Sequence, residues 1–133
     1  PETQVVLPLL KSDLFTVMRA VTEGRLKDVP VEFDSGAACC VILASKGYPQ
    51  AYEKGCPITL PADYEGGEIY VAGAREQDGK LYSDGGRVLG VTQTAPTLQE
   101  AVAKAYALAG KVEFANGYCR TDIGRRALAA MED

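Results

Sequence analysis

The segment best suited to hold an anion runs from Ser83 to Gly90, where Arg87 follows Gly85 and Gly86. Glycine lets backbone N–H groups come close to a ligand, and a guanidinium can bind a phosphate with two parallel hydrogen bonds. The same pattern also fits a β-bulge followed by a solvated arginine. The segment therefore indicates either an anion site or an irregular strand.

Charged residues elsewhere are weaker candidates. Lys54 follows a turn rich in glycine, proline and tyrosine, so it can either hold a phosphate at a pocket rim or pair with Glu53 on a surface loop. Glu2 is either a site carboxylate or the acid of a first helical turn. Asp122 lies close in sequence to Arg120, which favours a structural ion pair over a catalytic acid.

The composition excludes several classes of function. The 133 residues include 14 basic and 18 acidic side chains but no histidine, and the formal net charge is −4. Without histidine, the chain cannot supply a His-based triad or a His-containing metal site. Scattered charge with a negative balance argues against nucleic-acid binding, and no apolar run reaches the roughly 20 residues that a membrane span needs. No nucleophile–base pair and no nucleotide-binding glycine loop between a strand and a helix is recognisable.

The four cysteines, Cys39, Cys40, Cys56 and Cys119, contain no Cys-x-x-Cys pair, so their spacing does not fit zinc or thioredoxin-type sites. We expect reduced thiols in a cytoplasmic protein. The first two lie in an apolar run, where strand alternation would send them to opposite faces. The sequence starts at Pro1 with no Met and no signal peptide, so we expect a chain that either lost residues or was cut from something longer.

Apolar spacing of three and four residues predicts helices near both ends of the chain. Residues 3–26 fit two short helices or one kinked helix, with Asp13 as a cap and Gly24 at the end. A capping box at Thr97 and Glu100 predicts a helix that ends at Gly110. A last helical turn is expected at residues 124–131.

The middle of the chain is typical of a small antiparallel sheet. Asp78-Gly79 is a strong hairpin signal. Strands are expected at residues 31–33, 38–44, 69–72, 81–82, 87–92 and 111–114. The residues alone therefore predict an α+β domain with an anion-binding rim.

Four motifs in this order and spacing carry a family resemblance: Pro1-Glu-Thr-Gln-Val-Val-Leu-Pro, Ser45-Lys-Gly-Tyr-Pro-Gln-Ala-Tyr-Glu-Lys-Gly, Gly85-Gly-Arg-Val-Leu-Gly-Val-Thr and Tyr118-Cys-Arg-Thr-Asp-Ile-Gly-Arg-Arg-Ala. Together they resemble the C-terminal third of the phosphoribosylamine–glycine ligases, also called glycinamide ribonucleotide synthetases. The resemblance covers essentially the whole chain.

The resemblance implies an ATP-grasp ligase of purine biosynthesis. In that family ATP phosphorylates glycine, and 5-phosphoribosylamine attacks the glycyl phosphate, with Mg²⁺ or Mn²⁺ neutralising charge. It also implies a half-barrel-like, mostly antiparallel sheet with flanking helices in residues 29–133. Residues 1–28 would then be the helical end of the ATP-grasp domain.

The resemblance further implies roles for particular residues. Arg87, with the Gly85 and Gly86 amides, is expected to contact the sugar phosphate, and Lys54 and Glu2 are weaker candidates. The family's metal ligands precede the motif at which this sequence starts. We therefore expect a C-terminal fragment that neither binds ATP or metal nor ligates glycine by itself.

Two further interpretations remain open. The chain could be a free-standing, non-catalytic module that binds a phosphorylated metabolite or docks a separate ATP-grasp chain. It could also be a degradation product that self-associates through residues 5–21. In either case we expect no nucleic-acid or membrane partner.

Overall fold

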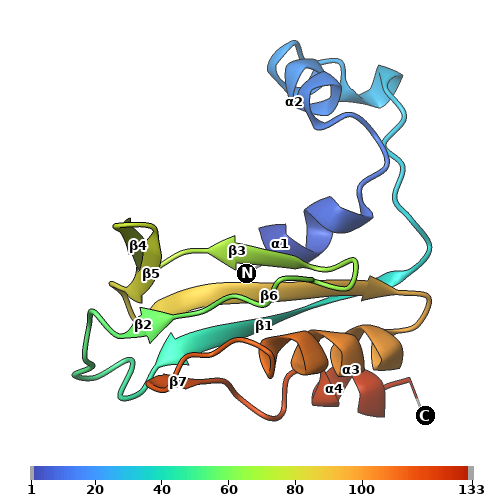
Figure 1. Cartoon of the computed structure of the whole chain (residues 1–133). Helices are drawn as coiled ribbons and strands as arrows, with labels where there is room; N and C mark the ends of the chain where they lie inside the picture. Colours follow the sequence, from blue (N-terminus) through green and yellow to red (C-terminus); the bar gives the residue numbers. More distant parts are fainter. Residues whose placement is uncertain (1, 132–133) are drawn as a thin grey trace.

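The computed structural model describes residues 2–131 and contains two antiparallel sheets. The larger has the strand order β3-β6-β1-β7, and the smaller has the order β2-β5-β4 (Figure 1). The strands are β1 (Ala37–Ser45), β2 (Pro57–Ile58), β3 (Glu68–Val71), β4 (Ala74–Gln77), β5 (Lys80–Ser83), β6 (Arg87–Ala95) and β7 (Gly117–Tyr118). The helices are α1 (Thr3–Val6), η1 (Leu7–Leu9), α2 (Leu14–Thr22), η2 (Leu26–Asp28), α3 (Leu98–Ala109) and α4 (Arg125–Ala129). The predicted α+β class with flanking helices is confirmed.

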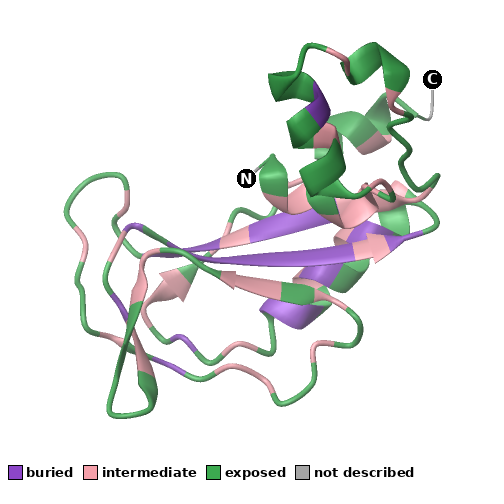
Figure 2. Ribbon diagram, turned by 90° about the horizontal axis from the view of Figure 1, so that it is seen from above, coloured by how far each residue is buried: buried purple, intermediate pink, exposed green. Residues whose placement is uncertain are grey.

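The core lies between the β1–β6 pair and α3, where Figure 2 shows the buried residues concentrated. Alternate β1 residues Cys39, Val41 and Leu43 join this core, as expected for a strand whose successive side chains point to opposite faces. Leu108 of α3 is fully buried against them. On the other side of the sheet, α1 contacts β1 and β6 (Figure 1).

Helix α3 begins and ends where its sequence predicts. Thr97 has extended backbone angles, and its side chain accepts a hydrogen bond from the Glu100 amide (3.3 Å). This satisfies one of the donors that a helix N-terminus leaves unpaired. The helix ends at Ala109, and Gly110 follows as its C-cap.

The N-terminal helices are also as predicted, in two segments. The Asp13 side chain accepts a hydrogen bond from the Thr16 amide (2.7 Å) at the start of α2, and Gly24 has the left-handed φ of a helix stop (+69°). Helix α2 stands away from both sheets (Figure 1). Phe15 is 72% exposed and Met18 is 60% exposed.

The strand predicted at residues 31–33 is wrong. Phe33 forms an isolated bridge with Leu10, and the amides of Lys11 and Ser12 both donate to the Glu32 carbonyl. The backbone groups of this segment are therefore satisfied by the N-terminal segment and not by a sheet neighbour. The connection ties the helical end to β1.

The strand predicted at residues 111–114 is also wrong. The amides of Lys111 and Val112 donate to the last carbonyls of α3, so these residues continue the helix terminus. Glu113 forms an isolated bridge with Thr59. By contrast, the hairpin prediction at Asp78-Gly79 is confirmed, with positive φ at both residues between β4 and β5.

No helix among residues 2–131 is long and apolar enough to cross a membrane. The boundary predicted between residues 28 and 29 stays a prediction.

Candidate anion site at the start of β6

A bulge at the start of β6 decides which way Arg87 faces. Leu43 pairs with Leu89, but Ala44 pairs with Arg87, so Val88 has no partner on β1. Without this extra residue, Arg87 would lie opposite Ser45, on the face that α3 covers. The bulge moves Arg87 to the opposite face, which Ile42 and Gly90 also share.

Close packing explains why both residues before Arg87 are glycine. A Cβ on Gly85 would lie 2.9 Å from the Cα of Gly73, so two backbones touch at this point. A Cβ on Gly86 would run into the ring of Tyr48. Both positions therefore need glycine for steric reasons, whatever they bind.

The hydrogen bonds of the diglycine leave its donors available. The Ser45 amide donates to the Gly86 carbonyl (2.8 Å), and the Ser45 hydroxyl donates to the Gly85 carbonyl (2.9 Å). Neither the Gly85 nor the Gly86 N–H has a hydrogen-bond partner within residues 2–131. The Gly86 amide is thus a buried donor without a partner, although most buried backbone donors are paired, and neither glycine lines the cavities that Arg87 lines.

Arg87 is exposed and lies between two cavities. One cavity of about 290 Å³ includes Ile42 and Tyr48, and another of about 280 Å³ includes Gln4 and Ala72. Arg87 makes no ion pair with the part of the chain that the structure describes. Its guanidinium is therefore available to an anionic ligand.

Glu2, from the start of the chain, lies near Arg87. The pKa of the Glu2 carboxyl is lowered, chiefly by a hydrogen bond from its own backbone amide, and the charge of Arg87 is a smaller cause. The packing of α1 on the sheet brings these two residues together although 84 residues separate them in sequence. The site thus combines a cation, a carboxylate and backbone donors.

Lys54 lies at the same end of the sheet as Arg87, but it forms an ion pair with a residue other than the predicted Glu53. Its Nζ lies 3.5 Å from Oδ1 of Asp84, directly before the diglycine, so the pairing with Glu53 is wrong. The segment is held there because the Gly55 amide donates to the Ser83 carbonyl (2.6 Å). Both charged side chains are about half exposed, so the pair contributes little to stability.

Asp122 forms the structural ion pair that the sequence predicts. Nε and Nη2 of Arg120 donate to its two carboxylate oxygens at 2.8 and 2.7 Å. Hydrogen bonds from Arg120 lower the pKa of Asp122, so this carboxyl is poorly suited to act as a general acid.

Sequence reasoning did not single out Tyr48 and Gln4 as neighbours of Arg87. Both lie inside motifs quoted for the family resemblance, but nothing in their local pattern indicates which residue they approach. The vicinal cysteines are placed as predicted, with Cys39 in the core and Cys40 lining the cavity beside Arg87. All four cysteines are free thiols.

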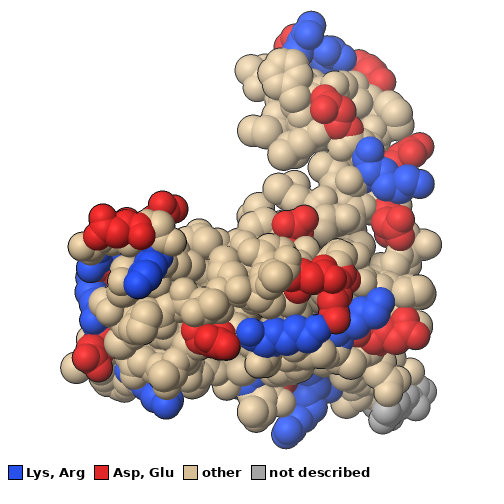
Figure 3. All heavy atoms as spheres, viewed as in Figure 1, with Lys and Arg blue, Asp and Glu red and all other residues tan. Residues whose placement is uncertain are grey.

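Within residues 2–131, no group of three or more acidic, cysteine or histidine side chains is placed to hold a metal ion. Figure 3 shows acidic and basic side chains interspersed over the visible face. The same view shows a broad hollow between the α2 end and the β4–β5 end of the molecule.

Comparison with known proteins gives consistent matches. The family described as "Phosphoribosylglycinamide synthetase, C domain" matches residues 38–126. The phosphoribosylamine–glycine ligase of Chlorobaculum tepidum is 50% identical over 131 residues, covering 96% of this chain and 31% of the relative. That of Agrobacterium fabrum is 49% identical over 130 residues, covering 97% and 31%.

A solved structure matches as well. The crystal structure of phosphoribosylamine–glycine ligase from Thermotoga maritima superposes with a TM-score of 0.75 at 46% identity, covering 92% of this chain and 30% of that chain. The chain thus spans about a third of the length of the relatives that it matches.

Proposed function

The chain belongs to the phosphoribosylglycinamide synthetase C-domain family, and from this premise we propose that it forms the phosphoribosylamine side of the active site in a phosphoribosylamine–glycine ligase. The resemblance predicted from four sequence motifs is confirmed. The relatives are named as ligases that join phosphoribosylamine and glycine. What this chain contributes to such a reaction is the proposal.

The observation that carries the proposal is the group of anion-binding elements around Arg87. Arg87 lines two cavities, and its guanidinium holds the sugar phosphate, with the unpaired N–H groups of Gly85 and Gly86 directly before it in the chain and the Glu2 carboxylate near it. Lys54 lies at the same end of the sheet, where it pairs with Asp84. In this arrangement the chain orients phosphoribosylamine, whose amine is the nucleophile. Orientation of the reactants is a large part of the rate enhancement that such ligases supply.

The remaining chemistry belongs to the part of the relatives that this chain does not span. Formation of glycyl phosphate needs ATP and a divalent metal, and among residues 2–131 no group of three or more acidic, cysteine or histidine side chains is placed to hold a metal ion. We therefore assign no step involving ATP or metal to this chain. Residues 1–28 are the helical end of the ATP-grasp domain and residues 29–133 the C-terminal domain of an enzyme that works in the cytoplasm.

A chimeric ligase tests the proposal. In this chimera, our chain replaces the matching third of the Chlorobaculum tepidum relative. We expect glycine-dependent formation of ADP. Arg87→Met in the chimera should raise KM for phosphoribosylamine at least about tenfold, since a charge-assisted hydrogen bond contributes about 1.5–3 kcal/mol. KM for ATP and glycine should change little.

Arg75→Met is the matched control, because Arg75 contacts the Tyr82 ring and no part of the site. Equal KM values for phosphoribosylamine in the unmodified and Arg87→Met chimeras would remove Arg87 from the site. A folded but inactive chimera, together with tight binding of ribose 5-phosphate by the isolated chain, would favour the free-standing phosphometabolite-binding module instead.

A further inference from the structure

The cavity of about 290 Å³ beside Arg87 extends beyond the group of residues proposed to hold the sugar phosphate. Its β1 wall is apolar and is formed by Cys40, Ile42 and Ala44. Tyr48 and Tyr118 contribute aromatic side chains. The volume lies near the lower end of the range for small-molecule sites, which suits a ligand of about two fused rings.

Hydrogen bonds between distant segments hold the walls of the cavity in place. The Tyr118 hydroxyl donates to the Tyr48 carbonyl (2.9 Å), which joins two segments 70 residues apart. The Tyr106 hydroxyl donates to the Arg120 carbonyl (2.6 Å) and accepts from the Ile123 amide (3.1 Å). The cavity is therefore built by tertiary contacts and is largely preformed.

The charged side chains that line the cavity are both basic, and a carboxylate lies near each of them, Glu2 near Arg87 and Asp122 at Arg120. Arg87 and Arg120 both line it, and no acidic side chain does. Arg120 is paired with Asp122, whereas Arg87 makes no ion pair with residues 2–131. A ligand that placed a phosphate at Arg87 would gain a charge-assisted hydrogen bond, and its ring would cover the apolar wall.

We propose that this cavity is a binding site for a phosphate ester of a bicyclic aromatic group, with the phosphate at Arg87 and the ring between β1 and the two tyrosines. This ligand class differs from a sugar phosphate because it needs the apolar wall as well as the cation. Because the two sites share Arg87, an occupant of the cavity competes with a sugar phosphate. An aromatic phosphate bound in this cavity therefore inhibits binding of the sugar phosphate.

A titration of the whole chain with 1-naphthyl phosphate, followed by backbone amide NMR shifts, tests the site. We expect saturable shifts in β1 and residues 118–123, with a Kd at least tenfold below those of inorganic phosphate and 1-naphthol. Binding no tighter than inorganic phosphate would leave only an anion site and overturn the cavity proposal, without touching the proposed function. Shifts confined to α2 would overturn it too.

Two variants separate the cavity from the anion contact. Cys119→Phe fills the cavity without changing its charge. We expect this variant to bind 1-naphthyl phosphate at least tenfold more weakly and to bind inorganic phosphate with unchanged affinity. Arg120→Met is expected to weaken binding less than Arg87→Met, and the exposed Arg126→Met serves as the matched control. Unchanged binding in Cys119→Phe would contradict the proposal.

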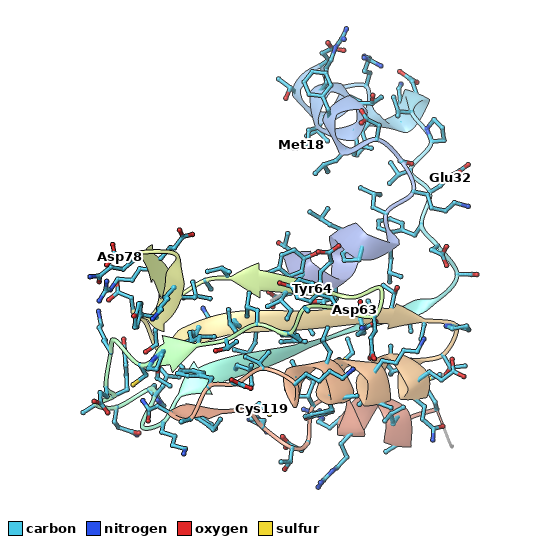
Figure 4. All side chains as sticks on the ribbon, in the orientation of Figure 1. Met18, Glu32, Asp63, Tyr64, Asp78 and Cys119 are labelled. Atoms are coloured by element: carbon cyan, nitrogen blue, oxygen red, sulfur yellow. The ribbon has the colours of Figure 1, made fainter. Side chains whose placement is uncertain are left out.

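Thiol protection gives a test on the unmodified chain, should Cys119→Phe fail to fold. Cys119 lines the cavity and lies by β7 and α3 (Figure 4), whereas Cys56 is also half-buried but lies outside it. Cys40 is buried, whereas Cys119 is only half-buried, so Cys119 is the better reporter. We expect 1-naphthyl phosphate to slow alkylation of Cys119 by iodoacetamide severalfold and to leave Cys56 unchanged. Equal rates with and without the ligand would count against the site.

Discussion

At the scale of single residues, Gly86 is constrained by Tyr48. A Cβ at this position would overlap the tyrosine ring, and that ring belongs to a segment that is tied to β7 by the Tyr118 hydroxyl. We expect Gly86→Ala to destabilise the fold by about 1–3 kcal/mol, the usual cost of overpacking. Urea denaturation measures the change.

The reason for this cost can be tested by a double-mutant cycle. If the ring causes the strain, Gly86→Ala should cost much less in a chain that already carries Tyr48→Ala, because the two residues are coupled. Additive effects of the two substitutions would mean that Gly86 is needed for another reason, such as backbone conformation.

At the scale of elements, α3 depends on its capping residue. Thr97→Ala removes the acceptor for the Glu100 amide and should cost about 1 kcal/mol of stability. Thr121→Ala is the matched control, because Thr121 is exposed and makes no side-chain hydrogen bond within residues 2–131. It should change stability by less than about 0.5 kcal/mol. Equal losses in the two variants, measured by chemical denaturation, would argue against the cap.

The N-cap of α2 makes stability depend on pH. Hydrogen bonds from the Thr16 side chain and amide lower the pKa of Asp13 below its ordinary value of 3.8. The unfolded chain therefore binds a proton at higher pH than the folded chain does, so this contribution is present above 3.8 and is lost as the pH falls through the folded pKa.

Asp13→Asn keeps a capping side chain but cannot titrate, so it isolates the charge. Thermal unfolding of both proteins from neutral to acidic pH should show a smaller acid loss for the variant. Parallel pH profiles for the two proteins would show that the Asp13 carboxylate makes no difference.

At the scale of the whole molecule, the apolar face of α2 is uncovered. Phe15, Met18 and Val21 are each more than half exposed, and a helix of nine residues has little stability by itself. Met18 lies on α2, away from both sheets (Figure 4), and the space-filling view shows the hollow beside this end of the chain (Figure 3). An exposed apolar face of this kind is suited to pack against another protein surface.

Without that cover, we expect the chain to self-associate through this face. Met18→Lys should shift sedimentation velocity profiles towards monomer, and Met131→Lys, at a methionine that is also exposed, should not. A chain that is monomeric at every concentration, or an equal effect of the two variants, would contradict this prediction.

The sequence by itself determined the features whose partners lie within a few residues. The caps at Asp13 and Thr97 and the hairpin at Asp78-Gly79 depend on local backbone geometry, so their residue types were sufficient. The apolar run of β1 predicted a buried strand because a continuous stretch of apolar residues is typical of a strand buried on both faces. Gly85, Gly86 and Arg87 could be selected as candidates because glycine and arginine have distinct chemistry.

Only the tertiary structure decided how those candidates are placed. The bulge at Val88 sets the face of Arg87, α1 brings Glu2 to it, and Lys54 pairs with Asp84 and not with its neighbour in sequence. Residues 31–33 do not join a sheet, because their backbone forms hydrogen bonds with the N-terminal segment. Each of these outcomes depends on contacts between segments far apart in the chain, and strand register and packing fix such contacts without leaving a local signal.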